Sequence, residues 1–285
     1  MDSFTQERVT VDSWCEAQEE LFLDSWRDDI NRFRPPFAYR GISREYDSLP
    51  TSLIRLGRKQ ETERFETSHG ADVEADILRN FIKYAKKESL SSRSEWHQLS
   101  VAQHYGLPTR ILDWTFSPLV ALHFATSGLS HLDEPGEIWV VNIDAVHEKL
   151  PDELADLMGG HVFTIDELND VADSLSDFDD LFNEKGIKES PIFFEPPSLD
   201  GRIVNQFALF SIFPDSEQYF DDWLDKHPNL YKKVIIQPNA KMEIRDKLDA
   251  SNITERVLFP GLDGLANWLT RYYTPITENE TRNPD

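Results

Sequence analysis

The residues best suited to chemistry gather in the segment from Gln103 to Thr115. Glycine and proline make this segment rich in turns, and loops of this kind often carry binding and catalytic groups. It combines an imidazole, a phenol, a guanidinium, a carboxylate, an indole and a hydroxyl, from His104, Tyr105, Arg110, Asp113, Trp114 and Thr115. The density of functional groups predicts a site. The alternative is a polar scaffold in which Asp113 pairs with Arg110 and Trp114 fills the core.

A second candidate is the arginine in the run Tyr39-Arg40-Gly41, which we expect at the end of a short strand. A guanidinium group binds phosphate or carboxylate through paired hydrogen bonds, and a glycine beside it permits close backbone approach. The run therefore predicts an anion clamp centred on Arg40. The alternative is an ordinary surface arginine or one that forms an ion pair.

A third candidate lies in the run from Arg202 to Phe210, which we expect within a strand. Arg202 and Gln206 are four residues apart, and side chains at that spacing on a strand point to the same face. Gln206 is suited to hydrogen-bonding an amide or a ribose. The alternative is a glutamine on a sheet face that meets solvent.

The charge of the chain restricts its partners. The net charge is −23, and residues 133–200 alone hold 19 acidic against 3 basic side chains. This balance argues against broad, non-specific binding of nucleic acid, because phosphates are repelled. Residues 32–110 hold 14 basic against 10 acidic side chains, which leaves room for a local basic cleft that binds a phosphate-bearing ligand.

The sequence carries no signal for a metal, a disulfide or a membrane. The single cysteine, Cys15, cannot form an intrachain disulfide, and no metal-ligand spacing is present. No apolar run reaches the roughly 18 residues of a membrane span, and no signal-peptide pattern opens the chain. We therefore expect a cytoplasmic protein with no membrane role and no bound metal.

Hydrophobic periodicity predicts an α+β fold. Helices are expected at residues 11–33, 72–88, 94–104, 118–125, 165–175, 241–248 and 262–272. Strands are expected at residues 37–41, 110–114, 137–143, 192–194, 204–213 and 230–237. Because strict β-α-β alternation is absent, we expect a mixed or antiparallel sheet flanked by helices, not a Rossmann fold. The expected domains are an N-terminal helical segment (1–34), one domain (35–275) with an acidic variable insertion at about 145–190, and a flexible tail (276–285).

Taken in chain order, the three candidate segments resemble the FRG domain family, which is named for a Phe/Tyr-Arg-Gly motif. Tyr39-Arg40-Gly41 matches that motif. The family's most specific stretch is similar to the segment from Gln103 to Thr115 and its continuation in Ser117-Pro118, Ala121-Leu122 and Phe124-Ala125. A late Arg…Gln-x-Gly-x-Phe pattern is matched by Arg202, Gln206 and Phe210, with Ala208 in the place of the glycine. With Leu258–Ala266, which resembles the family's close, the resemblance covers roughly residues 35–270.

The order of these groups also resembles, more weakly, the ADP-ribosyltransferases of the Arg/Ser/Glu type. In those enzymes the arginine holds NAD, a strand with a hydroxyl group supports the nicotinamide ribose, and a glutamate drives transfer. The resemblance implies an ADP-ribosyltransferase-like fold with NAD as substrate. It implies NAD contacts from Tyr39, Arg40, Gly41, Tyr105, Arg110, Trp114 and Thr115.

Gln206 falls near the place of the glutamate in that resemblance. Glutamine cannot act as a general base, so another group must assist transfer. Asp113 is the favoured carboxylate because it lies inside the segment from Gln103 to Thr115, called the central motif below, and Glu195 is a second candidate. His104 is an alternative base, because the pKa of an unperturbed imidazole is near neutral. The implied catalytic group is therefore Arg40, His104, Asp113 and Gln206.

Three functions remain open from the sequence. The first is an NAD-dependent ADP-ribosyltransferase, for example a bacterial toxin or antiphage effector, that modifies a protein or a nucleic acid. The second is a non-catalytic module that binds a ligand or a protein, with the acidic insertion contacting a basic partner such as an antitoxin. The third is a hydrolase or nuclease that uses Asp113, His104 and a metal.

Overall fold

The computed structural model describes residues 4, 8–28, 30–46, 48–56, 70–85, 94–152, 154, 162–171 and 190–275. The predicted tail at 276–285 lies outside the described residues. So do residues 155–161 and 172–189, which make up much of the predicted acidic insertion.

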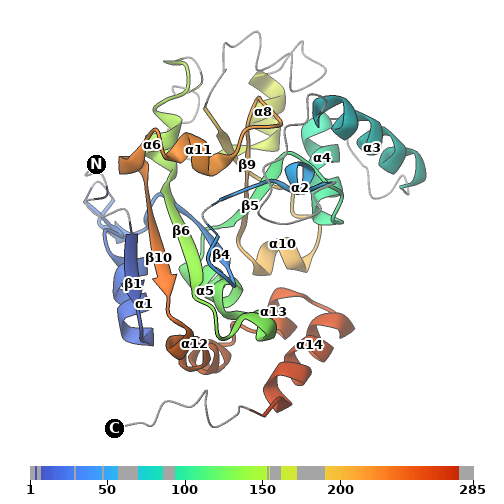
Figure 1. Ribbon diagram of the computed structural model, residues 1–285. Coiled ribbons are helices and arrows are strands. Elements are labelled where there is room, and N and C mark those ends of the chain that lie inside the picture. The colour runs from blue at the N-terminus through green and yellow to red at the C-terminus, as the bar shows by residue number, and fades with distance from the viewer. Residues whose placement is uncertain are drawn as a thin grey trace.

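A mixed eight-stranded sheet forms the centre of the molecule, in the order β1-β10-β6-β4-β5-β9-β8-β7 (Figure 1). Its strands are β1 (Arg8–Val11), β4 (Phe37–Ile42), β5 (Ile111–Thr115), β6 (Gly136–Asn142), β7 (Phe163–Thr164), β8 (Ile192–Glu195), β9 (Ala208–Ile212) and β10 (Tyr231–Ile236). β1 with β10 and β7 with β8 pair in parallel, and the other pairs are antiparallel. The prediction of an α+β fold with a mixed sheet flanked by helices is confirmed.

Helices cover the sheet through three clusters of buried apolar side chains. One cluster joins β1, β4, β6 and β10 to α1 (Trp14–Phe22), α5 (Pro118–Thr126) and α12 (Pro238–Ala250). A second joins β5, β8 and β9 to α3 (Gly70–Tyr84), α4 (Glu95–His104) and α8 (Ile165–Val171). The third packs α6 (Ile143–His147) and α11 (Phe220–Leu224) on the sheet. The remaining helical elements are α2 (Ser52–Arg55), α10 (Gly201–Asn205), α13 (Glu255–Leu258), α14 (Leu262–Tyr273), and 3-10 turns at Leu129–His131 and Pro228–Leu230. No helix of the described ranges is long and apolar enough to cross a membrane.

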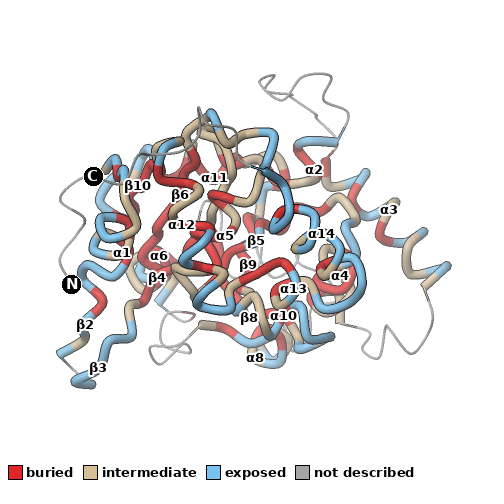
Figure 2. The backbone as a smooth tube through the Cα atoms, turned by 90° about the horizontal axis from the view of Figure 1, so that it is seen from below, coloured by how far each residue is buried: buried red, intermediate tan, exposed pale blue. Residues whose placement is uncertain are grey.

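The N-terminal region differs from its prediction. The helix expected at 11–33 is confirmed only over α1, because the helix ends at Phe22 and Asp24 takes a positive φ of 58°. The chain then forms a hairpin of β2 (Trp26–Arg27) and β3 (Arg32–Phe33), which is largely exposed (Figure 2). The apolar pattern that predicted one long helix includes Trp26, but this residue packs on Phe33 at 4.9 Å between ring centroids instead of entering the core. Residues 8–11 form the edge strand β1, so this region contributes a strand to the main sheet.

The segment predicted as an acidic insertion contributes to the sheet where it is described. β7 extends the sheet beyond β8, and Leu168 of α8 is fully buried against it. The start of α8 is fixed by a reciprocal pair of hydrogen bonds: Thr164 N–H donates to Glu167 Oε2 at 2.7 Å, and Glu167 N–H donates to Thr164 Oγ1 at 3.3 Å. These elements belong to the core around β8 and β9.

Helix α5 approaches the sheet closely over two glycines. A Cβ atom at Gly41 would lie 1.9 Å from the carbonyl oxygen of Ala121, and one at Gly136 would lie 2.2 Å from that of Ala125. No larger residue fits either position without displacing the helix. The glycine of the Tyr39-Arg40-Gly41 run therefore serves the contact between β4 and α5, and this contact fixes α5 beside Arg40.

His147 is expected to make stability depend on pH. Burial lowers the pKa of this imidazole to about 3, and its Nε2 accepts a hydrogen bond from Phe193 N–H at 2.9 Å, which requires the neutral ring. The unfolded chain binds this proton near pH 6.5, whereas the folded chain binds it only near pH 3. The free energy of unfolding should therefore be highest above pH 6.5 and should fall with decreasing pH by up to ~1.4 kcal/mol per unit for this residue.

Urea unfolding of the wild type and His147→Gln between pH 8 and 5 measures this effect. Glutamine keeps an acceptor oxygen but has no proton to bind, so the variant should show the shallower dependence. His123 contributes a parallel slope in both proteins, because burial, followed by the charge of Arg245, lowers its pKa to about 3. Identical slopes in the two proteins would contradict the prediction.

Candidate functional site

A cavity of about 230 Å3 opens where the two central strands separate. β4 and β5 pair at one position only, Tyr39 with Thr115, whereas β4 continues along β6 and β5 along β9. The sheet is therefore split beyond that pair. The cavity lies at the split and is closed by α4, α5 and α10.

Most of the predicted site residues meet at this cavity. Its lining includes the whole of the predicted catalytic group, Arg40, His104, Asp113 and Gln206. Of the other predicted residues, Tyr39, Gly41, Trp114 and Thr115 also line it. Tyr105 and Arg110 do not. These side chains belong to β4, β5, α4 and the end of α10, which are far apart in the sequence but meet at the cavity.

Arg40 bridges the split between β4 and β5. Its Nη1 donates a short hydrogen bond to the backbone carbonyl of Asp113. This side-chain bond takes the place of the backbone hydrogen bond that a paired neighbouring strand would make there. Burial lowers the pKa of Arg40 to about 10, an effect that Asp113 opposes and Arg55 strengthens. The group still carries its charge at neutral pH. Its Nε is buried and has no hydrogen-bond partner among the residues that the structure describes, so the guanidinium retains donor capacity at the cavity.

Asp113 places a carboxylate at the same cavity. The residue is exposed, and its Oδ2 accepts a hydrogen bond from Gln103 Nε2 at 2.8 Å. Gln103 is fixed in turn, because its Oε1 accepts from Thr109 Oγ1 at 2.6 Å. Oδ1 of Asp113 has no partner within the described part of the chain. One carboxylate oxygen is thus held in place while the other remains available to a ligand.

His104 is joined to Asp200 at the edge of the cavity, with 2.9 Å between Nε2 and Oδ2. Asp200 also caps α10 by accepting hydrogen bonds from the Arg202 and Ile203 amides. Burial raises the pKa of Asp200, but the Arg202 amide, His104 and the Ile203 amide together pull it below its usual value. The carboxylate is therefore ionised at neutral pH, and the contact ties α4 to α10 across the cavity.

Arg202 and Gln206 lie on a helix, so the prediction of a strand at 204–213 is wrong in its first part. Residues 201–205 form α10, Gln206 caps its end, Phe207 reverses the chain with a φ of 46°, and only residues 208–212 form β9. Asp200 is the N-cap residue of this helix, which the apolar pattern at 204–213 did not indicate. Both side chains still line the cavity. Spacing of four places two residues on one side of a helix as well as of a strand.

Gln206 has a structural role. Its Nε2 donates to the carbonyl of Leu258 at 2.9 Å, which anchors α13, and its own carbonyl accepts from Thr115 Oγ1 at 2.7 Å. The Thr115 hydroxyl also accepts from Ser117 N–H at 3.0 Å. These bonds commit the Thr115 hydroxyl to holding β5, α5 and α10 together.

Two predicted ligand contacts have their side chains in the core. Trp114 donates from Nε1 to Ser211 Oγ at 2.8 Å and packs on Phe220, so its indole cannot stack on a nicotinamide in this arrangement. The alternative that the Gln103–Thr115 segment is a scaffold is therefore correct for Trp114, which fills the core. Tyr39 is fully buried, and its hydroxyl donates to the carbonyl of Leu21 at 3.2 Å.

Arg110 and Tyr105 lie outside the cavity. Arg110 is buried and pairs with Glu74 of α3, with 2.5 Å between Nε and Oε2, so its predicted pairing with Asp113 is wrong. The sequence could not show this partner, which is 36 residues away. Tyr105 is 66% exposed and packs on the His104 ring at 5.3 Å between centroids.

Phe124, Ile203 and Phe210 also line the cavity and supply apolar surface. Arg202, which opens the third candidate run, supplies a second guanidinium group. The ring of Phe259 lies 5.2 Å from the guanidinium carbon of Arg202. Phe124 lies in a mostly apolar helix, where a ligand contact and a core residue look alike in sequence. Gln103 belongs to the central motif, but only its bond to Asp113 reveals its role as a positioning residue.

The residues described by the structure contain no group of three or more histidine, cysteine, aspartate or glutamate side chains placed to hold a metal ion. The chemistry available at the cavity is that of two guanidinium groups, one carboxylate and an imidazole. Such a set binds an anionic ligand and offers one proton acceptor.

Comparison with known proteins gives one match. Residues 35–134 match the family model of the FRG domain. The match is shorter than the resemblance at 35–270, and it ends before α10 and β9. A search of curated proteins and a search of solved structures found no match. The matched range spans β4, α5 and the whole segment from Gln103 to Thr115. Residues 35–134 are therefore similar to the FRG domain, and the strands that carry Arg40 and Asp113 lie within the matched range.

Proposed function

We propose that the cavity at the split between β4 and β5 binds NAD and transfers its ADP-ribose to a macromolecular acceptor. The observation that carries this proposal is the meeting of Arg40 and Asp113 in one cavity, where Asp113 is the only acidic residue among the described residues of the lining. An arginine clamp binds phosphate, and a carboxylate beside it can stabilise the positive charge that develops when a glycosidic bond breaks. The proposal includes an ADP-ribosyltransferase-like fold, which the split in the mixed sheet supports.

Arg40 and Arg202 are placed to hold the pyrophosphate of NAD. Both line the cavity, and neither forms an ion pair with a carboxylate in the described ranges. Phe124 and Phe210 offer apolar surface to the rings of the ligand. His104, bonded to Asp200, holds α4 and α10 at a fixed separation and so maintains the shape of the cavity.

Asp113 is the group proposed to act on the reacting bond. The bond between the nicotinamide nitrogen and C1 of its ribose breaks, and nicotinamide leaves as a neutral molecule with the bonding electrons. The oxocarbenium-like ribose is stabilised by the negative charge of Asp113. A hydroxyl or amine of the acceptor then forms the new bond to C1 and releases its proton to the carboxylate. Gln206 has no part in this step.

The acceptor is a protein or a nucleic acid in this proposal. A role as a toxin or antiphage effector, with a basic antitoxin that contacts the acidic insertion, is consistent with a net charge of −23. It makes the complex sensitive to salt, because long-range charge attraction is screened.

Incubation of the protein with labelled NAD, alone and with fractions of cell protein and nucleic acid, tests the proposal. Wild type should release nicotinamide and label one fraction. Arg40→Gln should weaken NAD binding by about ten- to a hundredfold, because a charge-assisted contact to phosphate is lost. Arg79→Gln is the control, since Arg79 lies on the exposed surface of α3. Full activity in Arg40→Gln would remove this residue from the site.

A non-catalytic ligand-binding module is the second candidate function. It is favoured by one observation: the glutamine in the place of the expected glutamate is bonded to the carbonyl of Leu258 and serves the fold. This function predicts that NAD raises the melting temperature while no nicotinamide is released in any fraction. Nicotinamide release that depends on Asp113 would exclude it.

A further inference from the structure

A second cavity adjoins the first and shares Arg40 with it. Its volume is about 380 Å3, and Arg40, Gly41 and Phe124 line both cavities. The rest of its wall comes from the chain that follows β4 and from α2, and includes Ser43, Tyr46, Ser48, Leu49 and Arg55. The two cavities are therefore neighbours that share part of their walls.

The charges of the second cavity favour an anion. Arg40 and Arg55 line it, and none of the described residues in its wall is an aspartate or glutamate. Arg55 is close enough to affect Arg40, whose pKa is lowered first by burial, raised by Asp113 and lowered again by Arg55. An anion between the two guanidinium groups relieves their repulsion. Because the chain as a whole has a net charge of −23, this positive cavity is a local feature and does not follow from composition.

Arg55 belongs to α2, a helix that hydrogen bonds hold in place. Leu53 N–H of α2 donates to the carbonyl of Thr109 at 3.0 Å, and Ser52 Oγ donates to the same carbonyl at 3.2 Å. Arg55 itself donates from Nη1 to the carbonyl of Pro50 at 2.9 Å. These bonds tie α2 to the central motif, so the position of Arg55 relative to Arg40 is fixed in advance of ligand binding.

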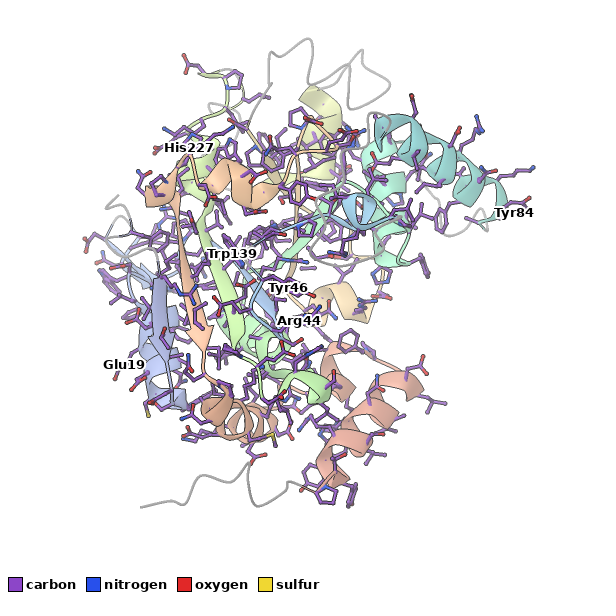
Figure 3. All side chains as sticks on the ribbon, viewed as in Figure 1. Glu19, Arg44, Tyr46, Tyr84, Trp139 and His227 are labelled. Atoms are coloured by element: carbon purple, nitrogen blue, oxygen red, sulfur yellow. The ribbon has the colours of Figure 1, made fainter. Side chains whose placement is uncertain are left out.

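The second cavity also has surfaces for a ring. Tyr46 lines the cavity and supplies one such surface. Arg44 lies outside the lining and packs on Tyr46, with 4.4 Å between its guanidinium carbon and the ring centroid (Figure 3). Phe124 forms the wall shared with the first cavity, and serine hydroxyls line the remainder. Aromatic and guanidinium planes are the surfaces on which proteins stack nucleobases.

We propose that the second cavity is a subsite for a 5′-phosphorylated nucleoside, with the phosphate between Arg40 and Arg55 and the base beside Tyr46. The inference rests on the proposed function for the occupant of the first cavity. Two molecules supply a 5′-phosphorylated nucleoside to such a subsite: NAD, through its AMP half, and a nucleic-acid acceptor, through one of its nucleotides. Ligand pockets measure about 300–1,000 Å3, so the first cavity alone is too small for a dinucleotide. This comparison favours the AMP half of NAD.

Calorimetric titration with 5′-AMP and with adenosine tests the subsite in the full chain. Wild type should bind 5′-AMP more tightly than adenosine. Arg55→Gln should raise the Kd for 5′-AMP about tenfold, because one charge-assisted contact to phosphate is lost, and should leave adenosine unaffected. Arg55 is exposed, so the substitution leaves the core intact. Arg79→Gln on α3 is the matched control and should bind as wild type does.

Further titrations separate the two sources. A parallel rise in the Kd for NAD in Arg55→Gln assigns the subsite to the dinucleotide. An unchanged Kd for NAD, with weaker binding of a 5′-phosphorylated single-stranded oligonucleotide, assigns it to the acceptor. Equal affinity of wild type and Arg55→Gln for 5′-AMP would overturn the subsite. If NAD is never turned over while 5′-AMP binding depends on Arg55, the proposed reaction fails and the subsite stands.

Discussion

Replacing Asp113 with asparagine is expected to lower kcat for NAD cleavage by about 10²- to 10⁴-fold and to change NAD affinity little. Asparagine has the shape of aspartate and keeps an oxygen that accepts the hydrogen bond from Gln103. The carbonyl that accepts from Arg40 belongs to the backbone and is also kept. The substitution therefore removes a charge and a proton acceptor while the surrounding contacts persist.

Single-turnover release of nicotinamide, with NAD binding measured separately by calorimetry, distinguishes the two effects. Asp76→Asn is a suitable control, because Asp76 is an exposed carboxylate on α3 that pairs with Arg79. Gln103→Ala should give an intermediate loss of kcat, since it frees the Asp113 carboxylate without removing it. Unchanged kcat in Asp113→Asn, with normal unfolding behaviour, would rule out Asp113 as the catalytic carboxylate.

Replacing Glu74 with glutamine is expected to lower the free energy of unfolding by about 3–5 kcal/mol. Glu74 and Arg110 are 4% and 5% exposed, and Glu74 accepts hydrogen bonds at 2.5 Å from both the backbone N–H and the Nε of Arg110. Removing the negative charge leaves the Arg110 guanidinium buried with a weaker partner. The penalty is large because the low-polarity surroundings do not solvate the remaining charge.

Urea unfolding of Glu74→Gln, followed by circular dichroism, measures this loss. The exposed pair Asp76–Arg79 lies on the same helix, so Arg79→Gln tests the effect of removing a surface ion pair and should cost less than about 1 kcal/mol. The contrast between the two variants isolates burial as the cause. A loss below 1 kcal/mol in Glu74→Gln would show that α3 does not hold the central motif through Arg110.

Many elements of this fold follow from local sequence. The helices α3, α4, α5, α12 and α14 and the strands β4, β5, β6, β8 and β10 were all predicted. Two errors have the same origin. The hairpin after α1 and the helix α10 are short, and the apolar spacing around Trp26 and Val204 is compatible with more than one element. In both places a residue with positive φ, Asp24 or Phe207, decides the path of the chain.

The sequence by itself determined that this chain has an α+β fold, that it resembles the FRG family, and that Arg40, His104 and Asp113 are candidates for one site. Those conclusions depend on residue types and spacing, which are local. Only the tertiary structure decided which groups face the cavity. The split between β4 and β5 turns Arg40 toward Asp113, whereas Arg110 takes Glu74 and Trp114 takes Ser211 as partners. Partners this far apart in the sequence are set by strand order and packing, which no short motif records.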